Sequence, residues 1–410
     1  MTVRRDLTFD ILKGIAILEV VTHHVLGMAA RRYVEEGTAG WLLVVMLNRV
    51  LHFAVPTFLL VSALLLARSL SKHDEPNWWL FLKRRVLRTG YPYLVWTALY
   101  LAVRGWDTDL GLTQTLIWGK AWYHLYFLAI LLEVSLLFPL LFLLLRAWRP
   151  DFTRLLVAAA AVQGFVYVFN YYTRILPYPG SSALFYLFPV FVGAWLGMNW
   201  QQWPQVWGKW KFRILQAMAV SLALYLLAEV LLLSSVPVGR QPYFTLFRLH
   251  PALLLLYSTA AALFLLRVAQ DMAEHSSLRA MFAQIGDRSL AIFLVHPAVV
   301  FLVQGPRVTA FLNNLPLTTL WALLLVFSVS WAIVEGLERM RLSRLLFARD
   351  FLPLGAYSVR RRRLAMATAG TRRQPAIRQA RQDTGRFRPR AASAPTRSDR
   401  TEPTPLQSKR

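Results

Sequence analysis

The chain has 410 residues, of which 56% are hydrophobic and only 16% are charged, and its mean hydropathy is +0.43. A soluble domain of this size cannot hide so much apolar side chain, because its surface must remain wetted. The chain contains no cysteine, which excludes disulfides, thiolate nucleophiles and cysteine-ligated metals. These properties are typical of an integral membrane protein.

The apolar residues form ten blocks of roughly 20 residues, about the length of a helix that crosses a bilayer. The blocks cover residues 8–30, 41–67, 89–104, 121–146, 154–172, 183–199, 212–234, 243–267, 288–305 and 316–337. We therefore expect an all-α integral membrane domain over residues 1–345, with about ten transmembrane helices.

The loops between these blocks differ in their content of lysine and arginine. If the N-terminus lies inside, the inside segments before the C-terminal tail contain 17 of these residues and the outside segments contain 8. Positive charges favour the cytoplasmic side of a membrane. We expect a multi-pass protein of the cell inner (plasma) membrane, with both termini in the cytoplasm.

The last segment, residues 346–410, differs in composition from the rest. Residues 360–410 contain 15 Lys and Arg against Asp383, Asp399 and Glu402, and are rich in Pro, Ala, Ser and Thr. This composition predicts a disordered cytoplasmic tail. A basic tail after a last helix favours contact with anionic membrane lipids, or is a solvated segment that helps to fix the topology. We expect no nucleic-acid partner.

The first apolar block contains five ionisable residues, more than any other block: Asp10, Lys13, Glu19, His23 and His24. They make the block too polar for a cleaved signal peptide. Ionisable side chains are costly inside a bilayer and by default indicate function. We therefore expect a retained helix that takes part in the activity.

Three of these residues share one face of the helix. Lys13 and His24 are eleven residues apart, about 20° past three full turns, and Asp10 lies about 40° from His24. Asp10 and Lys13 can form an ion pair near the cytoplasmic end, whereas His24 lies about 16 Å farther along. Histidine suits general-base chemistry near neutral pH; the alternative is a histidine that only makes a hydrogen bond within the bundle. Glu19 and His23 lie off this face and could pair with each other.

This helix resembles the opening helix of the acyltransferase-3 family, whose members include fucose-4-O-acetylase-like and exopolysaccharide acetyltransferases of the membrane. The family's first helix carries an Asp, a basic residue three positions later, and a His after ten further residues. Asp10, Lys13 and His24 meet this spacing. The basic residue of the family is more often Arg; Lys keeps the charge but loses the planar fork.

Five later segments resemble family motifs in the same order, so that the resemblance covers roughly residues 5–337. They are the stretch from Val55 to Ala63, where the family has Gly at its end; Arg85-Val86-Leu87-Arg88, followed by Tyr91-Pro92-Tyr93; His124 to Leu128, with Tyr126 for the usual Trp; Phe188 to Gly193; and Gly286 to Leu290, leading to His296-Pro297. The tail is not covered.

The resemblance implies transfer of an acyl group from cytoplasmic acyl-CoA, with acetyl-CoA the first candidate, to a hydroxyl of an extracytoplasmic carbohydrate or glycolipid. It implies His24 as general base, with Asp10 and Lys13 orienting the helix and the donor; an acyl-histidine intermediate is the alternative. It also favours Arg85 and Arg88 as ligands of the CoA phosphates, although they fit simple positive-inside bias as well. Acyl-CoA is then a co-substrate and not a bound cofactor.

Several polar and aromatic residues are candidates for binding the acceptor. His124 and His296 are expected near the outer ends of their helices, with Trp122 and Tyr126 close to His124. Such groups suit the face of a sugar, but they also anchor helices at the membrane interface. Glu133 either lines the same cavity or pairs with a buried base. No spacing typical of metal ligands is present in the sequence.

The competing class is a transporter or flippase for a glycan or lipid, and a third is a glycan polymerase. Ten helices with buried charges suit a transporter equally well. An export pathway, however, requires neither the spacing from Lys13 to His24 nor paired arginines at the inner end of a helix, and no internal repeat is visible. A polymerase usually has large outside loops, and the outside segments here are short.

Overall fold

The structure is a computed structural model, and it describes residues 6–108, 110–233 and 244–353. All regular structure in this part of the chain is helical, and no β-strand occurs in it. The predicted all-α class is therefore confirmed. The disorder predicted for the basic tail concerns residues 360–410, which lie outside the described residues.

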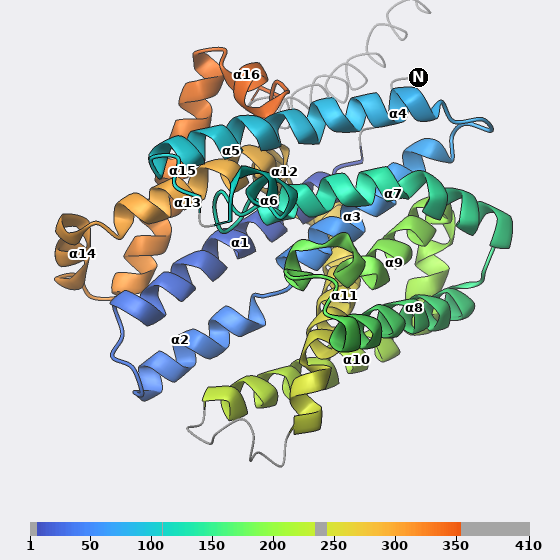
Figure 1. Ribbon diagram of the computed structural model, residues 1–410, viewed down its shortest axis with the longest axis horizontal. Coiled ribbons are helices and arrows are strands. Elements are labelled where there is room, and N and C mark those ends of the chain that lie inside the picture. Colours follow the sequence, from blue (N-terminus) through green and yellow to red (C-terminus); the bar gives the residue numbers. More distant parts are fainter. Residues whose placement is uncertain (1–5, 109, 234–243, 354–410) are drawn as a thin grey trace, which may run out of the picture. The chain divides into compact units, whose positions relative to one another are not determined.

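The helices follow one another along the described chain as Figure 1 shows. The α-helices are α1 (Thr8–Arg32), α2 (Ala39–Val50), α3 (Ala54–Leu70), α4 (Trp78–Arg85), α5 (Tyr91–Val103), α6 (Leu112–Ile117), α7 (Tyr126–Trp148), α8 (Phe152–Thr173), α9 (Leu187–Met198), α10 (Trp203–Leu233), α11 (Phe244–His275), α12 (Arg279–Asp287), α13 (Ser289–Val303), α14 (Pro306–Asn313), α15 (Thr318–Arg339) and α16 (Ser343–Phe347). The other helical segments are the π-helix η1 (Val86–Gly90) and the 3-10 helices η2 (Pro179–Ser181), η3 (Ala183–Tyr186) and η4 (Trp200–Gln202).

Seven helical stretches of the described chain are long and apolar enough to cross a membrane, in agreement with a membrane protein. They are Thr8–Arg32, Ala39–Leu70, Tyr126–Trp148, Phe152–Thr173, Trp200–Leu233, Leu249–His275 and Thr318–Arg339. The pair α12 and α13 adds an eighth if it counts as one span. Predicted spans 89–104 and 183–199 contain α5 and α9, whose 13 and 12 residues are fewer than the roughly 20 needed to cross. A total of ten spans stays a prediction.

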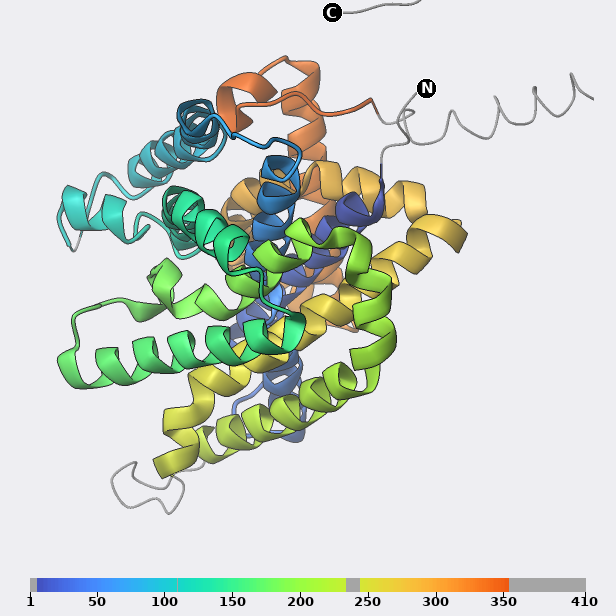
Figure 2. The same ribbon diagram turned by 90° about the vertical axis from the view of Figure 1, so that its right-hand side faces the viewer.

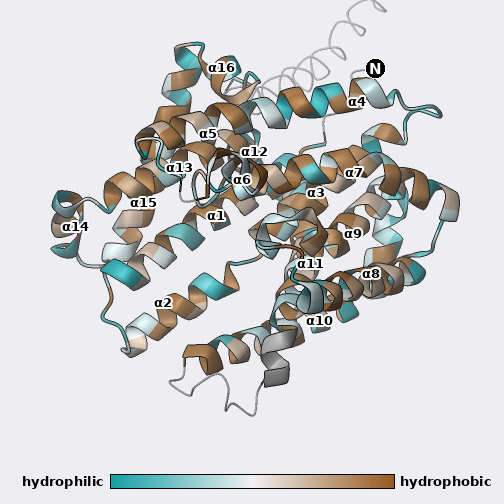
Figure 3. Ribbon diagram, viewed as in Figure 1, coloured by the Kyte–Doolittle hydropathy of each residue, from teal (hydrophilic) through white to brown (hydrophobic). Residues whose placement is uncertain are grey.

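The hydropathy of the residues differs between the long helices that could cross a membrane and the shorter helix α4. Figure 3 shows α7, α8 and α15 mostly in hydrophobic colours, whereas α4 carries a hydrophilic stretch. That stretch contains Lys83, Arg84 and Arg85 in the last turn of α4. Basic side chains there favour a position at the membrane surface.

Three irregularities of the backbone lie within the predicted spans or at their starts. A turn at residues 51–53 separates α2 from α3, and α12 meets α13 at a bend of 72°. The backbone widens into a π-helix at η1, directly before α5 with Pro92 in its first turn; π-helical turns are rare and often accompany functional sites. Irregular backbone inside a membrane is tolerated where it is buried in protein or lines a cavity.

Helix α1 is the central helix and passes diagonally through the middle of the bundle in Figure 1. It contacts α2, α3, α11, α12, α13 and α15, and 15 of its 25 residues are buried. Its N-terminal half lies directly on the backbone of α12, because a Cβ on Gly14 would overlap the Phe282 carbonyl and one on Gly286 would overlap the Asp10 carbonyl. This close approach fixes the ionisable face of α1 against its neighbours.

A second close approach joins α3 to α9. Gly193 and Gly197 are four residues apart on α9, and a Cβ on either would overlap a carbonyl oxygen of α3, from Leu60 or Leu64. Small residues at this spacing let membrane helices pack closely. On another side of the bundle, the long helices α10 and α11 lie side by side, as both ribbon views show (Figures 1 and 2).

The chain after α15 packs back onto the bundle. The ring of Phe347 stacks on Trp96 at a centroid distance of 5.8 Å, and Trp96 Nε1 donates a hydrogen bond to the Leu346 carbonyl at 2.9 Å. Phe351 is buried as well. Residues 346–353, which the composition places in the tail, therefore contact the membrane domain.

Candidate active site

The middle of the bundle contains a cluster of histidine side chains. The ring of His24 on α1 lies 5.3 Å from that of His296 on α13, in a stacked arrangement, and 4.9 Å from that of Tyr123. The ring of His124 lies 6.0 Å from that of His296. The fold thus brings together three histidines that lie far apart in the sequence.

The tautomer of His296 follows from its hydrogen bond. Nδ1 lies 3.0 Å from the carbonyl oxygen of Ile292, and a carbonyl oxygen only accepts, so Nδ1 carries the proton. Nε2 of the neutral ring is then an acceptor, and it is buried with no partner in the described structure, as are both ring nitrogens of His124. Buried polar atoms without partners cost free energy, so these atoms point to a ligand.

A cavity of about 50 Å³ lies beside these rings. Its walls include His24 and His124, Glu19 and His23 from α1, and His52 from the turn between α2 and α3. The volume admits a water molecule but not a sugar. A ligand larger than water therefore enters this cavity only if the surrounding side chains move.

Glu19 and His23 do not pair with each other. His23 Nδ1 lies 2.9 Å from the Asn48 carbonyl, and Asn48 Nδ2 donates to the His23 carbonyl at 2.6 Å. The carboxyl of Glu19 faces the Ala54 amide but meets hydrogen-bond geometry with no described residue. The support of His23 thus comes from α2, and the Glu19 carboxyl is left at the cavity wall.

Contacts continue from His52 towards α10 and α11. His52 Nδ1 lies 3.1 Å from Tyr225 Oη, and the Tyr225 ring lies 4.8 Å from that of His250. Glu229 pairs with His250 Nε2 and with Arg49 Nε, each at 2.9 Å. Because buried charges need partners, this group stabilises the helices around the cavity. No group of three or more His, Asp or Glu side chains in the described chain has the arrangement of a metal site.

The ion pair predicted within α1 is present. Lys13 Nζ lies 2.8 Å from Asp10 Oδ1, and Asp10 is almost fully buried. Neither residue lines the cavity beside His24, which lies about 16 Å from Lys13 along the helix. The pair therefore fits a positioning role and not contact with reacting atoms.

A larger cavity, of about 630 Å³, lies between α3, α4, η1 and α7. Arg84, Arg85 and Arg88 all line it. The Nε atom of Arg85 is buried with no hydrogen-bond partner, and burial, followed by the positive charges of Arg88 and Arg84, lowers the pKa of the Arg85 guanidinium. A clustered set of guanidinium groups in a cavity suits a phosphate ligand.

The remaining candidates fall into two groups. Tyr126 lines the small cavity, and Trp122 stacks on Tyr100 at 4.8 Å with its Nε1 buried and unpaired. Glu133, in contrast, accepts hydrogen bonds from the Ala183 amide at 2.7 Å and from Ser182 Oγ at 3.3 Å. These bonds hold the start of η3, so the contacts of Glu133 are those of a structural residue.

Comparison with known families shows to which protein family the chain belongs. The model of the acyltransferase-3 family, described as an acyltransferase domain, matches residues 6–335. The chain belongs to the acyltransferase-3 family. This acyltransferase-3 domain includes every residue of both cavities and makes the chain a membrane acyltransferase. No curated protein and no solved structure matches the chain.

The acyltransferase-3 site also contains residues that the sequence did not single out. His52 lies with Asn48 and Arg49 in a block that is mostly apolar. Polar residues in an apolar block also drew attention to the first helix, but here they were not enough to predict the turn that places His52 at the cavity. Tyr123 lies between Trp122 and His124 in the sequence. Only the structure shows that its ring contacts His24.

Proposed function

We propose that this acyltransferase moves an acyl group, with acetyl the first candidate, from cytoplasmic acyl-CoA to a hydroxyl of an extracytoplasmic carbohydrate or glycolipid. The observation that supports this most is the position of His24 beside the unpaired imidazole nitrogens of His124 and His296, next to a small cavity that His24 and His124 line. The reaction needs a base for the hydroxyl, and the ring of His24 lies within a continuous group of five histidine rings, with His23 and His52 on one side and His296 and His124 on the other.

A path for the donor follows from the two cavities. The smaller cavity is lined by Val55 of α3 and Phe127 of α7, and the larger one by Ser62 and Leu66 of α3 and by Leu131 and Ser135 of α7. At about 100° per residue, these positions fall within about 80° of one another on each helix. We infer that the pantetheine arm lies along this groove between α3 and α7, with the thioester towards His24 and the diphosphate at Arg85 and Arg88.

In the proposed reaction, His24 removes the proton of the acceptor hydroxyl as its oxygen attacks the thioester carbonyl. The new C–O bond forms and the C–S bond breaks. His24 then returns the proton to the thiolate, which leaves as the CoA thiol, so that no net proton is released. The alternative is attack by His24 itself, with an acyl-histidine intermediate.

The other residues have supporting roles in this proposal. The pair of Asp10 and Lys13 holds α1 in position, as does the close contact of α1 with α12. His124, His296, Trp122 and Tyr126 surround the acceptor. Glu133 orders the segment that begins at η3.

We further propose that the protein lies in the inner (plasma) membrane with both termini in the cytoplasm, where the basic tail contacts anionic lipids. A transporter or flippase is less well supported, because transport requires neither a buried unpaired arginine donor in a cavity nor a cluster of unpaired imidazoles.

The direct test uses purified protein with labelled acetyl-CoA and a glycan acceptor. We expect wild-type protein to label the acceptor, and His24→Ala to lower the rate about 10²–10⁴-fold with the same amount of folded protein. His275→Ala is the matched control, because this histidine is exposed at the end of α11, and it should transfer at the wild-type rate. Failure of the wild type to bind acyl-CoA, or normal transfer by His24→Ala, would refute the proposal.

A further inference from the structure

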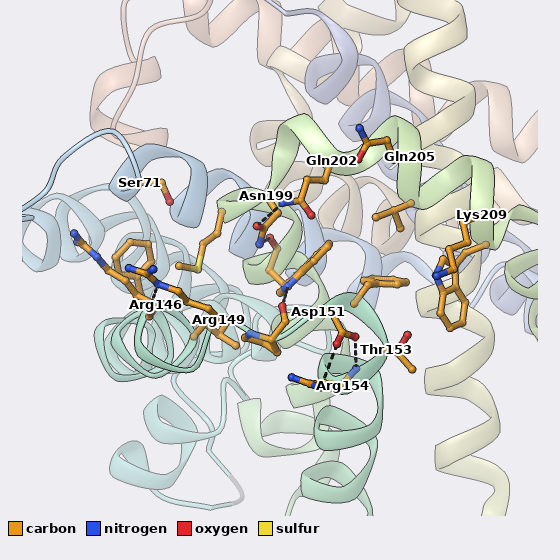
Figure 4. A pocket seen from close by; sticks show the side chains of 18 of the residues that line it. Ser71, Arg146, Arg149, Asp151, Thr153, Arg154, Asn199, Gln202, Gln205 and Lys209 are labelled. Atoms are coloured by element: carbon orange, nitrogen blue, oxygen red, sulfur yellow. Dashed lines mark hydrogen bonds and ion pairs between the residues drawn. The ribbon is translucent and has the colours of Figure 1, made fainter.

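The largest of the described cavities lies at the ends of helices that the charge distribution assigns to the cytoplasmic side. It has a volume of about 1030 Å³ and is bounded by the loop after α3, the end of α7, the first turn of α8, the end of α9 and the start of α10 (Figure 4). His73 lines both this cavity and the cavity of Arg85 and Arg88. The two cavities are therefore neighbours.

This cavity has an apolar floor, a basic rim and a wall of amide side chains. The floor consists of buried Phe142, Phe152 and Trp195, with half-buried Trp210 beside them. The basic side chains Arg146, Arg149, Arg154 and Lys209 lie around it, and Figure 4 shows Asn199, Gln202 and Gln205 across from the arginines.

Two of the four cations already have acidic partners. Arg154 Nε lies 3.2 Å from Asp151 Oδ2, and Arg146 donates to the Asp74 carbonyl oxygen at 2.7 Å, with the Asp74 carboxylate 4.0 Å away. Arg149 and Lys209 have no carboxylate within ion-pair distance in the described part of the chain, although the charge of Lys209 acts on Asp151 from a longer distance. Neither cation is held in a direct ion pair, so both can meet an anionic ligand.

The cavity also continues the groove along α7. Leu131 and Ser135 line the arginine cavity, and Phe142 and Arg149 line this one. At about 100° per residue, the first three positions lie within about 40° of one another on α7, and Arg149 directly follows its last turn. A ligand that follows this face past Ser135 in the direction of the α7 C-terminus reaches the larger cavity.

We propose that this cavity binds the 3′-phosphoadenosine end of acyl-CoA, an inference that rests on the proposed use of acyl-CoA as donor. Arg149 and Lys209, which lie at opposite ends of the cavity in Figure 4, supply the positive charge that attracts the 3′-phosphate. The adenine packs against Trp210, and Gln202 and Gln205 offer donors and acceptors to its edge. A lipid head group could bind the two cations but would leave the amides of Gln202 and Gln205 and the indole of Trp210 without contacts. The nucleotide therefore matches the cavity better.

The experiment measures binding of adenosine 3′,5′-bisphosphate to the purified full chain, and the KM for three donors: acetyl-CoA, acetyl-dephospho-CoA and acetyl-pantetheine. In the double variant Arg149→Ala/Lys209→Ala, we expect affinity for the bisphosphate to fall at least about 10-fold and the KM for acetyl-CoA to rise by a similar factor, with kcat unchanged. The KM for the other two donors, which lack the 3′-phosphate, should not change. Lys211→Ala is the control, since this lysine lies on the same helix but does not line the cavity.

Three outcomes overturn the inference. If the double variant binds the bisphosphate and acetyl-CoA as the wild type does, the subsite is wrong while the acyltransferase proposal stands. If the double variant loses only binding to phosphatidylglycerol vesicles, the cavity is a lipid site. If wild-type protein neither binds nor uses acyl-CoA, the proposed donor fails and the subsite fails with it.

Discussion

His296 has the best-defined chemistry of the residues around His24. Its Nδ1–H donates to the Ile292 carbonyl, which orients the ring and leaves Nε2 as a buried acceptor. An acceptor atom beside the proposed base suits a sugar hydroxyl that donates a hydrogen bond as it binds. The placement of this atom depends on the helix register of α13, and on the 72° bend that sets the direction of that helix.

We predict that His296→Phe, which keeps a ring but removes Nε2, lowers kcat/KM for the acceptor about 10–100-fold, the value of one or two buried hydrogen bonds. Binding of acyl-CoA should not change, because the arginine cavity does not include His296. Steady-state kinetics with varied acceptor, together with equilibrium binding of acyl-CoA, check this. An unchanged kcat/KM in His296→Phe would show that His296 does not bind the acceptor.

Arg288 gives a second prediction at the level of a single residue. It is 1% exposed and forms ion pairs with Glu335 and Asp287 and a hydrogen bond to the Leu352 carbonyl. Its removal takes one cationic partner from the carboxylates of Asp287 and Glu335, which have little exposure to water. We therefore expect Arg288→Met to destabilise the protein by about 3–5 kcal/mol. The midpoint of thermal unfolding in detergent measures this.

The matched control for Arg288 is Arg344→Met. Arg344 is exposed and pairs with Asp350 at 2.6 Å, and exposed pairs contribute little because water and salt screen them. An equal loss of thermal stability in the two variants would show that the buried ion pairs of Arg288 stabilise the protein no more than an exposed pair does.

Helix packing in this protein depends on glycines at two crossings, and these set the position of the site. At the crossing of α3 and α9, Gly193 allows the two backbones to touch, and α3 in turn lines both cavities of the proposed donor path. A shift of α3 would therefore widen or close the groove as well as weaken the packing.

We predict that Gly193→Ala strongly lowers the yield and thermal stability of folded protein, because the added Cβ would overlap the Leu60 carbonyl, which is backbone and cannot move aside. Gly164→Ala on α8 is the control, since no atom lies within 4 Å of a Cβ at that position, and it should match or slightly exceed the wild type. Size-exclusion profiles and unfolding midpoints in detergent check both variants. Equal behaviour of the two would contradict the proposed close contact.

Across the whole molecule, the sequence predicted the helical class, the membrane setting and most long helices, since an apolar block of sufficient length has few other structures available in a bilayer. It did not predict the turn at His52 or the bend at Arg288, because single polar residues within apolar blocks do not reveal where the backbone breaks. The ion pair of Asp10 and Lys13 was predictable from spacing within one helix. The ring contacts of His24 were not, because they depend on how separate helices face one another.

The transfer of an acyl group across the membrane is the central claim, and sidedness tests it most directly. Proteoliposomes with known orientation would receive labelled acetyl-CoA only on the side of the α3–α4 loop and a glycan acceptor only on the side of the α1–α2 loop. We predict that the acceptor becomes labelled in this arrangement, and that it stays unlabelled when donor and acceptor are both supplied only on the α1–α2 side. Labelling that occurs only when donor and acceptor share one side would contradict the account.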